Sequence, residues 1–177
     1  FSDQVNLLKL DLSYNRIDEF NNRTFNGLEN LRDLFIQENY LKRIQSYTFF
    51  HLKNLKTLNS FDYHKISFIE PKAFLSLKYI ENLNLRQNLL GSLVENTFKG
   101  LKILVILFLN KNHIQFIEEN VFKELEYLEV LDMSHNRIQF LNRNIFYGLK
   151  NIQILNFYNN FIIKFEANFN IFGSTIR

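Results

Sequence analysis

The stretch LEVLDMSHNRIQFLNRNIFYGL, residues Leu128–Leu149, sets out a pattern that the whole chain repeats. Its order is L-x-x-L-x-L-x-x-N-x-I-x-x-L-x-x-x-x-F-x-x-L, with Met133 in the third leucine place. Three columns of this pattern recur every 24 residues with one extra residue in the third unit: Asn15, Asn39, Asn88, Asn112, Asn136 and Asn160; Phe25, Phe49, Phe74, Phe98, Phe122 and Phe146; Leu28, Leu52, Leu77, Leu101, Leu125 and Leu149. Because the three columns share one period and one slip, the chain is an array of internal repeats.

Each column predicts a structural role. The two leucines of L-x-L point to the same side of a strand, because side chains alternate along it, and stacking successive strands about 4.8 Å apart buries that side. The asparagine ends the strand, where its amide can satisfy both N–H and C=O groups of a buried turn. The chain has only 5 Gly and 1 Pro, so we expect a ladder of these asparagines to replace ordinary turn chemistry.

The L-x-x-L-x-L-x-x-N segment resembles the signature of the leucine-rich-repeat family, and the resemblance extends over nearly the whole chain. It implies an α/β fold: a horseshoe-shaped solenoid with a concave parallel β-sheet and a mostly irregular or 3-10 convex side. We expect residues 1–177 to form a single domain of about seven coils. The chain begins inside a unit, and neither end has the pattern of a polar cap. These features favour a fragment of a longer array, with an intact short array as the alternative.

The stretch Leu58–Ile66, within the third unit, contains the extra residue. Counting forward from Leu55 places Tyr63 in the asparagine position, and counting back from Ile66 places His64 there. We expect a β-bulge that absorbs the residue and kinks the stack. The alternative is a pH-sensitive joint, because histidine changes its charge near neutral pH.

Composition and charge exclude several classes of protein. The chain is 46% hydrophobic and 22% charged, as expected of a folded domain. A formal net charge of +3 is too small to indicate a nucleic-acid partner or an anionic membrane. There is no cysteine, and no run approaches the ~20 apolar residues that a membrane-spanning helix requires.

Catalytic and metal-binding patterns are also missing from the sequence. The four histidines occupy different columns, and the chain has no HExxH, GxSxG, Walker or GxGxxG motif. We therefore expect a protein that is not an enzyme and that has no metal site, cofactor or small-molecule substrate.

A partner would contact the outward positions around L-x-L, which point away from the core. In the first units these positions are polar, whereas the last three units place apolar residues side by side. An exposed apolar patch on a sheet marks a contact surface, and aromatic residues are frequent anchors there. The predicted partner-binding residues are Ile106, Phe108, Val130, Ile154, Tyr158, Arg86 and Phe35. The alternative is that these β-branched residues only suit a strand.

Two further surface features have both a structural and a functional interpretation. A column of lysines (Lys53, Lys78, Lys102 and Lys150) is interrupted by glutamates (Glu29 and Glu126), which favours a solvated edge over a track for phosphate or sulfated glycan. Asn22-Arg23-Thr24 is a candidate N-glycosylation site on the convex side.

The 24-residue, phenylalanine-bearing unit is similar to those of Toll-type receptor and leucine-rich-repeat hormone-receptor ectodomains. This resemblance implies a ligand-recognition module of an extracellular receptor or a secreted adhesion protein: a glycoprotein, extracellular or at the cell surface, with a role in signal transduction. Its partner would be a protein ligand or co-receptor, and a membrane would be reached only through a segment missing from this chain. One alternative is a cytoplasmic scaffold or inhibitor protein. Another is a stack of coils that binds glycan or nucleic acid along the lysine edge.

Overall fold

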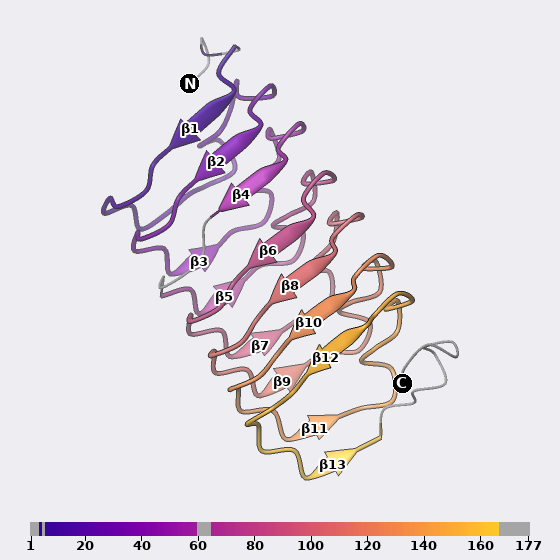
Figure 1. Ribbon diagram of the computed structural model, residues 1–177. Coiled ribbons are helices and arrows are strands. Elements are labelled where there is room, and N and C mark those ends of the chain that lie inside the picture. The colour runs from indigo at the N-terminus through magenta and orange to yellow at the C-terminus, as the bar shows by residue number, and fades with distance from the viewer. Residues whose placement is uncertain (1–3, 5, 60–64, 167–177) are drawn as a thin grey trace.

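Seven short strands, one per coil, form the front of an elongated stack (Figure 1). The computed structural model describes residue 4, residues 6–59 and residues 65–166. The strands are β1 (Lys9–Asp11), β2 (Asp33–Phe35), β4 (Thr57–Asn59), β6 (Asn82–Asn84), β8 (Ile106–Phe108), β10 (Val130–Asp132) and β12 (Ile154–Asn156). The predicted solenoid with a parallel sheet is confirmed. The expected bulge and pH-sensitive joint at Tyr63 or His64 lie outside the described residues.

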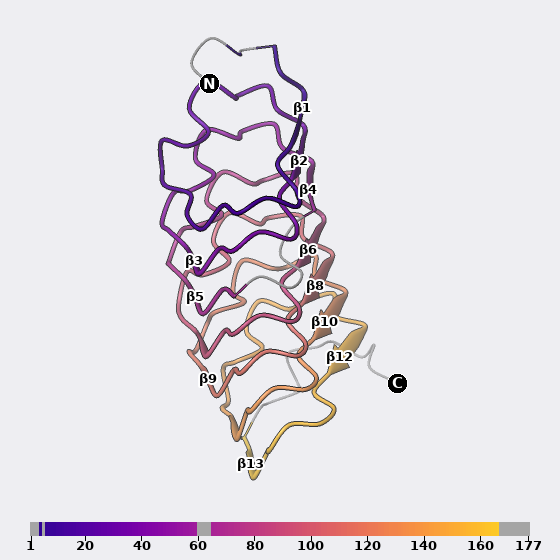
Figure 2. The ribbon, with the colours of Figure 1, turned by 90° about the vertical axis from the view of Figure 1, so that its left-hand side faces the viewer.

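A second set of two-residue strands lies behind the first set, one strand in each coil after the first (Figure 2). These strands are β3 (Arg43–Ile44), β5 (Phe68–Ile69), β7 (Ser92–Leu93), β9 (Phe116–Ile117), β11 (Phe140–Leu141) and β13 (Lys164–Phe165). Turns connect them, and the described residues contain no α- or 3-10 helix. The convex side is therefore irregular, and no helix in this part of the chain could cross a bilayer.

The front strands pair in parallel, and their register follows the repeat. Leu10 lies opposite Leu34 and Leu34 opposite Leu58, so leucines of successive units are direct neighbours. Pairing is not continuous, because β1-β2-β4 and β6-β8-β10-β12 are separately hydrogen-bonded sheets. The division falls at the unit that carries the extra residue, although β4 and β6 remain side by side (Figure 1).

The phenylalanine column forms the centre of the core. All six rings are buried, and consecutive rings stack at centroid distances of 5.9 Å for Phe25–Phe49, 5.9 Å for Phe49–Phe74 and 5.8 Å for Phe98–Phe122. Burying one such side chain stabilises the fold by about 1.5–3 kcal/mol. Since each ring is covered by the rings of adjacent coils, the stabilisation depends on the stack rather than on any single repeat.

The asparagine column links five of the coils to the coil before them. The Asn112 Oδ1 accepts the Leu90 N–H at 3.1 Å, while its Nδ2 donates to the Leu85 carbonyl at 2.9 Å and to the Leu109 carbonyl of its own coil at 3.0 Å. In the same way, a backbone N–H of the preceding coil donates to the side-chain oxygen of Asn39, Asn88, Asn136 and Asn160. One buried amide therefore satisfies backbone groups of two coils.

The residue before a ladder asparagine has a left-handed backbone conformation. These residues have φ between 54° and 57°: Tyr14, Glu38, Gln87, Lys111, His135 and Asn159. Such a conformation costs a non-glycine residue about 1 kcal/mol or more and persists only where surrounding bonds enforce it. The asparagine ladder supplies those bonds, which explains how the chain turns with so few glycines.

We expect Asn136→Ala to lower the free energy of unfolding by about 2–4 kcal/mol, because buried groups that lose their partners cost about 1–3 kcal/mol each. The change removes the acceptor of the Ile114 N–H at 3.0 Å and the donor to the Leu109 and Met133 carbonyls, each at 3.0 Å. Urea denaturation monitored by circular dichroism measures the effect.

The matched control is Asn15→Ala in the same column. Asn15 is exposed, and its Nδ2 donates only to carbonyls of its own coil, those of Leu12 and Ser13. This variant should lose less than about 1 kcal/mol. Equal losses at Asn15 and Asn136 would show that the contact between coils does not stabilise the fold.

We expect Gly100→Ala to destabilise the protein by about 2–4 kcal/mol, since the new Cβ has no space and the backbone conformation is unfavourable. A Cβ on Gly100, which has φ +101°, would lie 2.3 Å from the Leu75 carbonyl oxygen. The control is Gly91→Ala, where a Cβ would meet no atom within 4 Å. Thermal unfolding of both variants tests this, and a smaller loss at Gly100 than at Gly91 would contradict it.

Candidate binding surface

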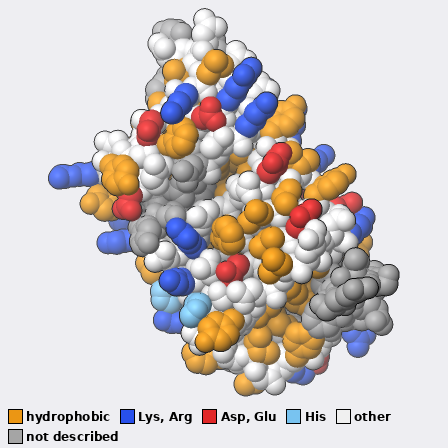
Figure 3. Space-filling view, viewed as in Figure 1, with side chains coloured by type: hydrophobic (Ala, Val, Ile, Leu, Met, Phe, Trp, Pro, Cys, Tyr) orange, Lys and Arg blue, Asp and Glu red, His pale blue; other side chains and the backbone are white. Residues whose placement is uncertain are grey.

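The outward side chains of the seven front strands form what we call the sheet face. In the last three coils, Ile106 lies opposite Val130 and Val130 opposite Ile154 in adjacent paired strands. Ile106 and Val130 are half-buried, whereas Ile154 is 56% exposed. Together with the half-buried Phe108, these residues form the apolar patch, and Figure 3 shows apolar side chains gathered over β8, β10 and β12.

The last residue of four of the seven front strands has a structural role that the sequence interpretation missed. Its side-chain oxygen accepts the backbone N–H two residues later, which fixes the turn that follows the strand. These bonds measure 3.0 Å for Asp11–Ser13, 3.1 Å for Asn84–Arg86, 2.9 Å for Asp132–Ser134 and 2.9 Å for Asn156–Tyr158. The polar residues of this column therefore close turns, and the Asx-turn preference of Asp and Asn is the sequence signal that could have shown it.

Phe35 and Phe108 occupy the same column but have side chains that cannot form this bond. The Lys9 Nζ lies 4.9 Å from the centre of the Phe35 ring and partly covers it. Phe108 lines a hollow of about 280 Å³ between β4 and β6, together with Thr57, Asn82 and other residues. Phe35 belongs to β2, in the other hydrogen-bonded sheet, so the structure does not bring the two rings together.

Tyr158 and Arg86 follow their strands and lie outside the apolar patch. Tyr158 is 72% exposed, and its ring meets the His135 ring edge to face at 5.5 Å. The His135 Nδ1 lies 2.8 Å from the Asn159 Nδ2. Arg86 is exposed and its backbone N–H is held by Asn84. Both residues remain predictions as partner contacts.

The lysine edge and the glycosylation motif lie away from the apolar patch. The Lys150 Nζ pairs with the Glu126 carboxylate at 2.8 Å, and the Lys78 Nζ lies 4.8 Å from the centre of the Tyr79 ring. The column is thus partly neutralised rather than a continuous cationic track. Asn22 is exposed at the start of a turn on the convex side, so its side chain is accessible to a glycan.

No group of three or more His, Cys, Asp or Glu side chains in the described part of the chain is arranged to hold a metal ion. The described histidines lie in separate coils, and His51 pairs with Glu29 at 3.7 Å.

Comparison with known proteins agrees with this geometry. The family described as "Leucine rich repeat" matches residues 1–59, 60–114 and 103–162. Toll-like receptor 3 of Boselaphus tragocamelus is 35% identical over 105 residues, which cover 55% of this chain and 12% of the receptor. Leucine-rich repeat-containing G-protein coupled receptor 5 of Rattus norvegicus is 37% identical over 91 residues, covering 51% of this chain and 10% of the receptor. The chain thus spans about a tenth of the length of the curated relatives it matches.

Solved structures share the fold over most of this chain. The crystal structure of the TLR13–ssRNA13 complex has a TM-score of 0.66 at 27% identity, over 89% of this chain and 26% of that one. The leucine-rich repeat domain of APL1B has a TM-score of 0.75 over 93% of this chain and 45% of that one. Identity to APL1B is 18%, so that likeness shows the fold alone.

We expect Ser13→Ala to raise the pKa of the Asp11 carboxyl towards its ordinary value. The Ser13 Oγ–H donates to Asp11 Oδ1 at 2.6 Å and is the largest cause of the lowered pKa; the Ser13 N–H and the Lys9 charge also lower it and remain in the variant. NMR titration of the carboxyl carbon measures the change. Ser13→Thr, which keeps the hydroxyl, should leave the pKa lowered.

The lowered pKa of Asp11 determines how the stability of the fold changes with pH. Because folding lowers the pKa of Asp11, the bond adds stability above the ordinary aspartate pKa of ~3.9 and loses it as the pH falls through the folded-state pKa. Wild type and Ser13→Ala should therefore differ in stability at neutral pH and converge in acid. A carboxyl midpoint that is unchanged in Ser13→Ala would contradict the assignment.

Proposed function

The chain belongs to the leucine-rich-repeat family, and from this we propose that it is a ligand-recognition module that binds a protein partner through its sheet face. We place it in an extracellular receptor or a secreted adhesion protein. The similarity to receptors of the Toll-like and G-protein-coupled types supports this setting. The proposal for this chain rests on its own surface, since the matched segments are a small part of those receptors.

Phe108 is the observation that carries the proposal. In the same column Asp11, Asn84, Asp132 and Asn156 each use a side-chain oxygen to close the turn after the strand. Phenylalanine cannot form that bond, and it places an aromatic ring on the outside of the sheet. A strand preference for bulky residues does not explain why this coil lacks the bond, whereas an aromatic anchor for a partner does.

The neighbouring column supports the same location. Its first members are Lys9, Asp33, Thr57 and Asn82, which interact well with water. Its last members are Ile106, Val130 and Ile154, which adjoin one another across paired strands. Apolar surface that a partner covers contributes about 25 cal/mol per Å² to the free energy of binding. The surface that would contribute in this way is concentrated in the C-terminal three coils.

The chemistry of the apolar patch favours a protein over a nucleic acid. The TLR13 complex contains an RNA. A nucleic acid is bound mainly through cations that contact phosphates. The four residues of the apolar patch include no cation, and β8, β10 and β12 contain none, so a partner with apolar side chains is the better match.

We also propose that Asn22 carries a glycan. It is exposed on the convex turn, so a glycan there would leave the sheet face free for the partner.

We expect the double variant Phe108→Asp/Ile154→Asp to weaken partner binding at least tenfold while the melting temperature stays close to that of wild type. Ile154 is 56% exposed, and an aspartate at 108 can accept the N–H of Asn110 as Asp132 accepts that of Ser134. Partners captured from extracellular fluid by the immobilised chain would be identified, purified and measured individually by surface plasmon resonance.

The matched control is Phe116→Asp, because Phe116 is an equally exposed apolar residue (58%) on β9, away from the sheet face. This variant should bind as wild type does. An equal loss of affinity in the control, or full affinity in the double variant, would refute the apolar patch as the binding site. A double variant that unfolds would show that its side chains belong to the core.

A further inference from the structure

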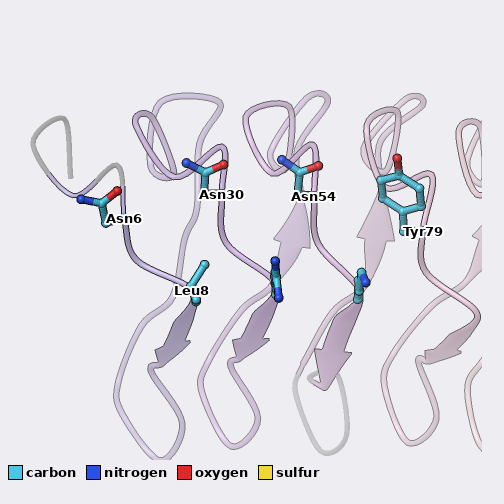
Figure 4. Close-up of a pocket in the computed structure, with 7 residues that line it drawn as sticks. Asn6, Leu8, Asn30, Asn54 and Tyr79 are labelled. Atoms are coloured by element: carbon cyan, nitrogen blue, oxygen red, sulfur yellow. The ribbon is translucent and has the colours of Figure 1, made fainter.

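A groove with different chemistry runs along the flank of the first four coils, just before their front strands. Its hollow of about 680 Å³ is lined by what we call the flank groove residues: Asn6, Leu8, Asn30, Arg32, Asn54, Lys56 and Tyr79. Figure 4 shows Asn6, Asn30, Asn54 and Tyr79 in one row, each on its own coil and pointing to the same side. Members of this row lie 24 or 25 residues apart, so the repeat itself aligns them.

The two cations of the flank groove are available to a ligand. Arg32 and Lys56 are exposed, lie in equivalent positions of adjacent coils, and form no ion pair or side-chain hydrogen bond with any other described residue. Their spacing is that of the coils, about 5 Å. Two like charges held at this distance attract an anionic group between them.

The amide row adds hydrogen-bonding groups in fixed positions. The Asn54 Nδ2 donates to the Glu29 carbonyl of the preceding coil at 2.8 Å, which orients the amide and leaves its Oδ1 to accept from a ligand. Tyr79, 41% exposed, ends the row with a hydroxyl and an aromatic ring, one face of which is partly covered by the Lys78 Nζ at 4.8 Å. Amides that both donate and accept, together with one aromatic ring, suit the hydroxyls and apolar faces of sugar rings.

The groove continues towards the sheet face and changes charge along its length. A second hollow of about 450 Å³ shares Lys56 and Tyr79 and is also lined by Glu81 and Asn82. The cationic part is therefore at Arg32 and Lys56, and a carboxylate borders the other end. An acidic ligand is expected to place its anion over the first coils and its neutral part towards Asn82.

Elsewhere on the surface of the described residues this combination is not repeated. In the last three coils the equivalents of Arg32 and Lys56 are Val105, Glu129 and Gln153. Another hollow, of about 620 Å³, is lined by Lys99, Lys102 and Lys123 but also by Glu124 and Glu126, and its described lining contains no amide side chain. Among the described residues, cations without an ion-pair partner beside a row of amides are therefore a feature of the N-terminal flank.

We propose that the flank groove binds an acidic oligosaccharide, with its sulfate or carboxylate held by Arg32 and Lys56, its hydroxyls by the amides of Asn30 and Asn54, and a sugar ring against Tyr79. A protein segment fits less well, since Leu8 is the only aliphatic side chain among the described residues that line the hollow. A nucleic acid fits less well too, because two cations and one aromatic ring offer few phosphate contacts and little base stacking. This site adjoins the apolar patch, because Lys56 and Phe108 line one hollow, but it shares no residue with the patch and does not rest on the function proposed above.

The test is binding of fluorescently labelled heparin-derived hexasaccharide to the full chain, measured by anisotropy. Unlabelled oligogalacturonate, maltohexaose, single-stranded DNA and polyglutamate compete in separate arms. We expect the heparin oligosaccharide to bind with an affinity that falls as salt rises, and maltohexaose to compete at least tenfold less well. Stronger competition by oligogalacturonate identifies a carboxylated rather than a sulfated sugar and still supports the site. Competition by DNA or polyglutamate as strong as that by heparin would overturn it.

Variants locate the site. Arg32→Gln/Lys56→Gln should weaken binding at least tenfold and reduce its salt dependence, whereas Lys65→Gln/Lys111→Gln, with the same change of charge at exposed lysines elsewhere, should bind as wild type does. Asn54→Ala should weaken binding without changing its salt dependence. Equal losses in the two double variants would show attraction by net charge only and would refute the flank groove. Binding of the protein partner should be unaffected by all three changes, which separates this result from the function proposed above.

Discussion

The constraint on which this structure depends is the set of hydrogen bonds that five asparagine side chains, each in a different coil, form with the coil before their own. A coil of 24 residues has to turn inside the molecule, where unpaired backbone groups cost about 1–3 kcal/mol each. The buried amides of Asn112 and Asn136 satisfy carbonyl and N–H groups in two coils at once. They also enforce the left-handed residue that precedes each of them, so the chain turns repeatedly with few glycines.

The same constraint determines how chemistry is distributed on the surface. Because the ladder fixes register, a position within the repeat becomes a column along the stack, and a few substitutions within a column create a local site. Ile106, Val130 and Ile154 make one column apolar over the C-terminal coils. Arg32 and Lys56 make another column cationic over the N-terminal coils. The two surfaces differ in chemistry and share no residue, although Lys56 and Phe108 line one hollow, so one domain presents two neighbouring contact areas.

Sequence reasoning predicted the strands, their pairing and the core well, because these follow from the two-residue alternation within L-x-L and the 24-residue period. It was less successful for the sheet face. Polar residues such as Asp132 were grouped with surface available to a partner, but the turn geometry shows that its oxygen accepts the Ser134 N–H. The flank groove was not anticipated, since its members come from four coils and become a site only when stacking aligns them.

The sequence by itself determined the repeat, the side of each strand that is buried and the column to which every residue belongs, because hydrophobic periodicity and hydrogen-bond satisfaction are local requirements. Only the tertiary structure decided which outward groups are free. Lys123 and Lys150 pair with glutamates of the preceding coil, Glu95 and Glu126, while Arg32 has no ion-pair partner among the described residues. Availability depends on distances between side chains of different coils, and those distances exist only once the coils have stacked.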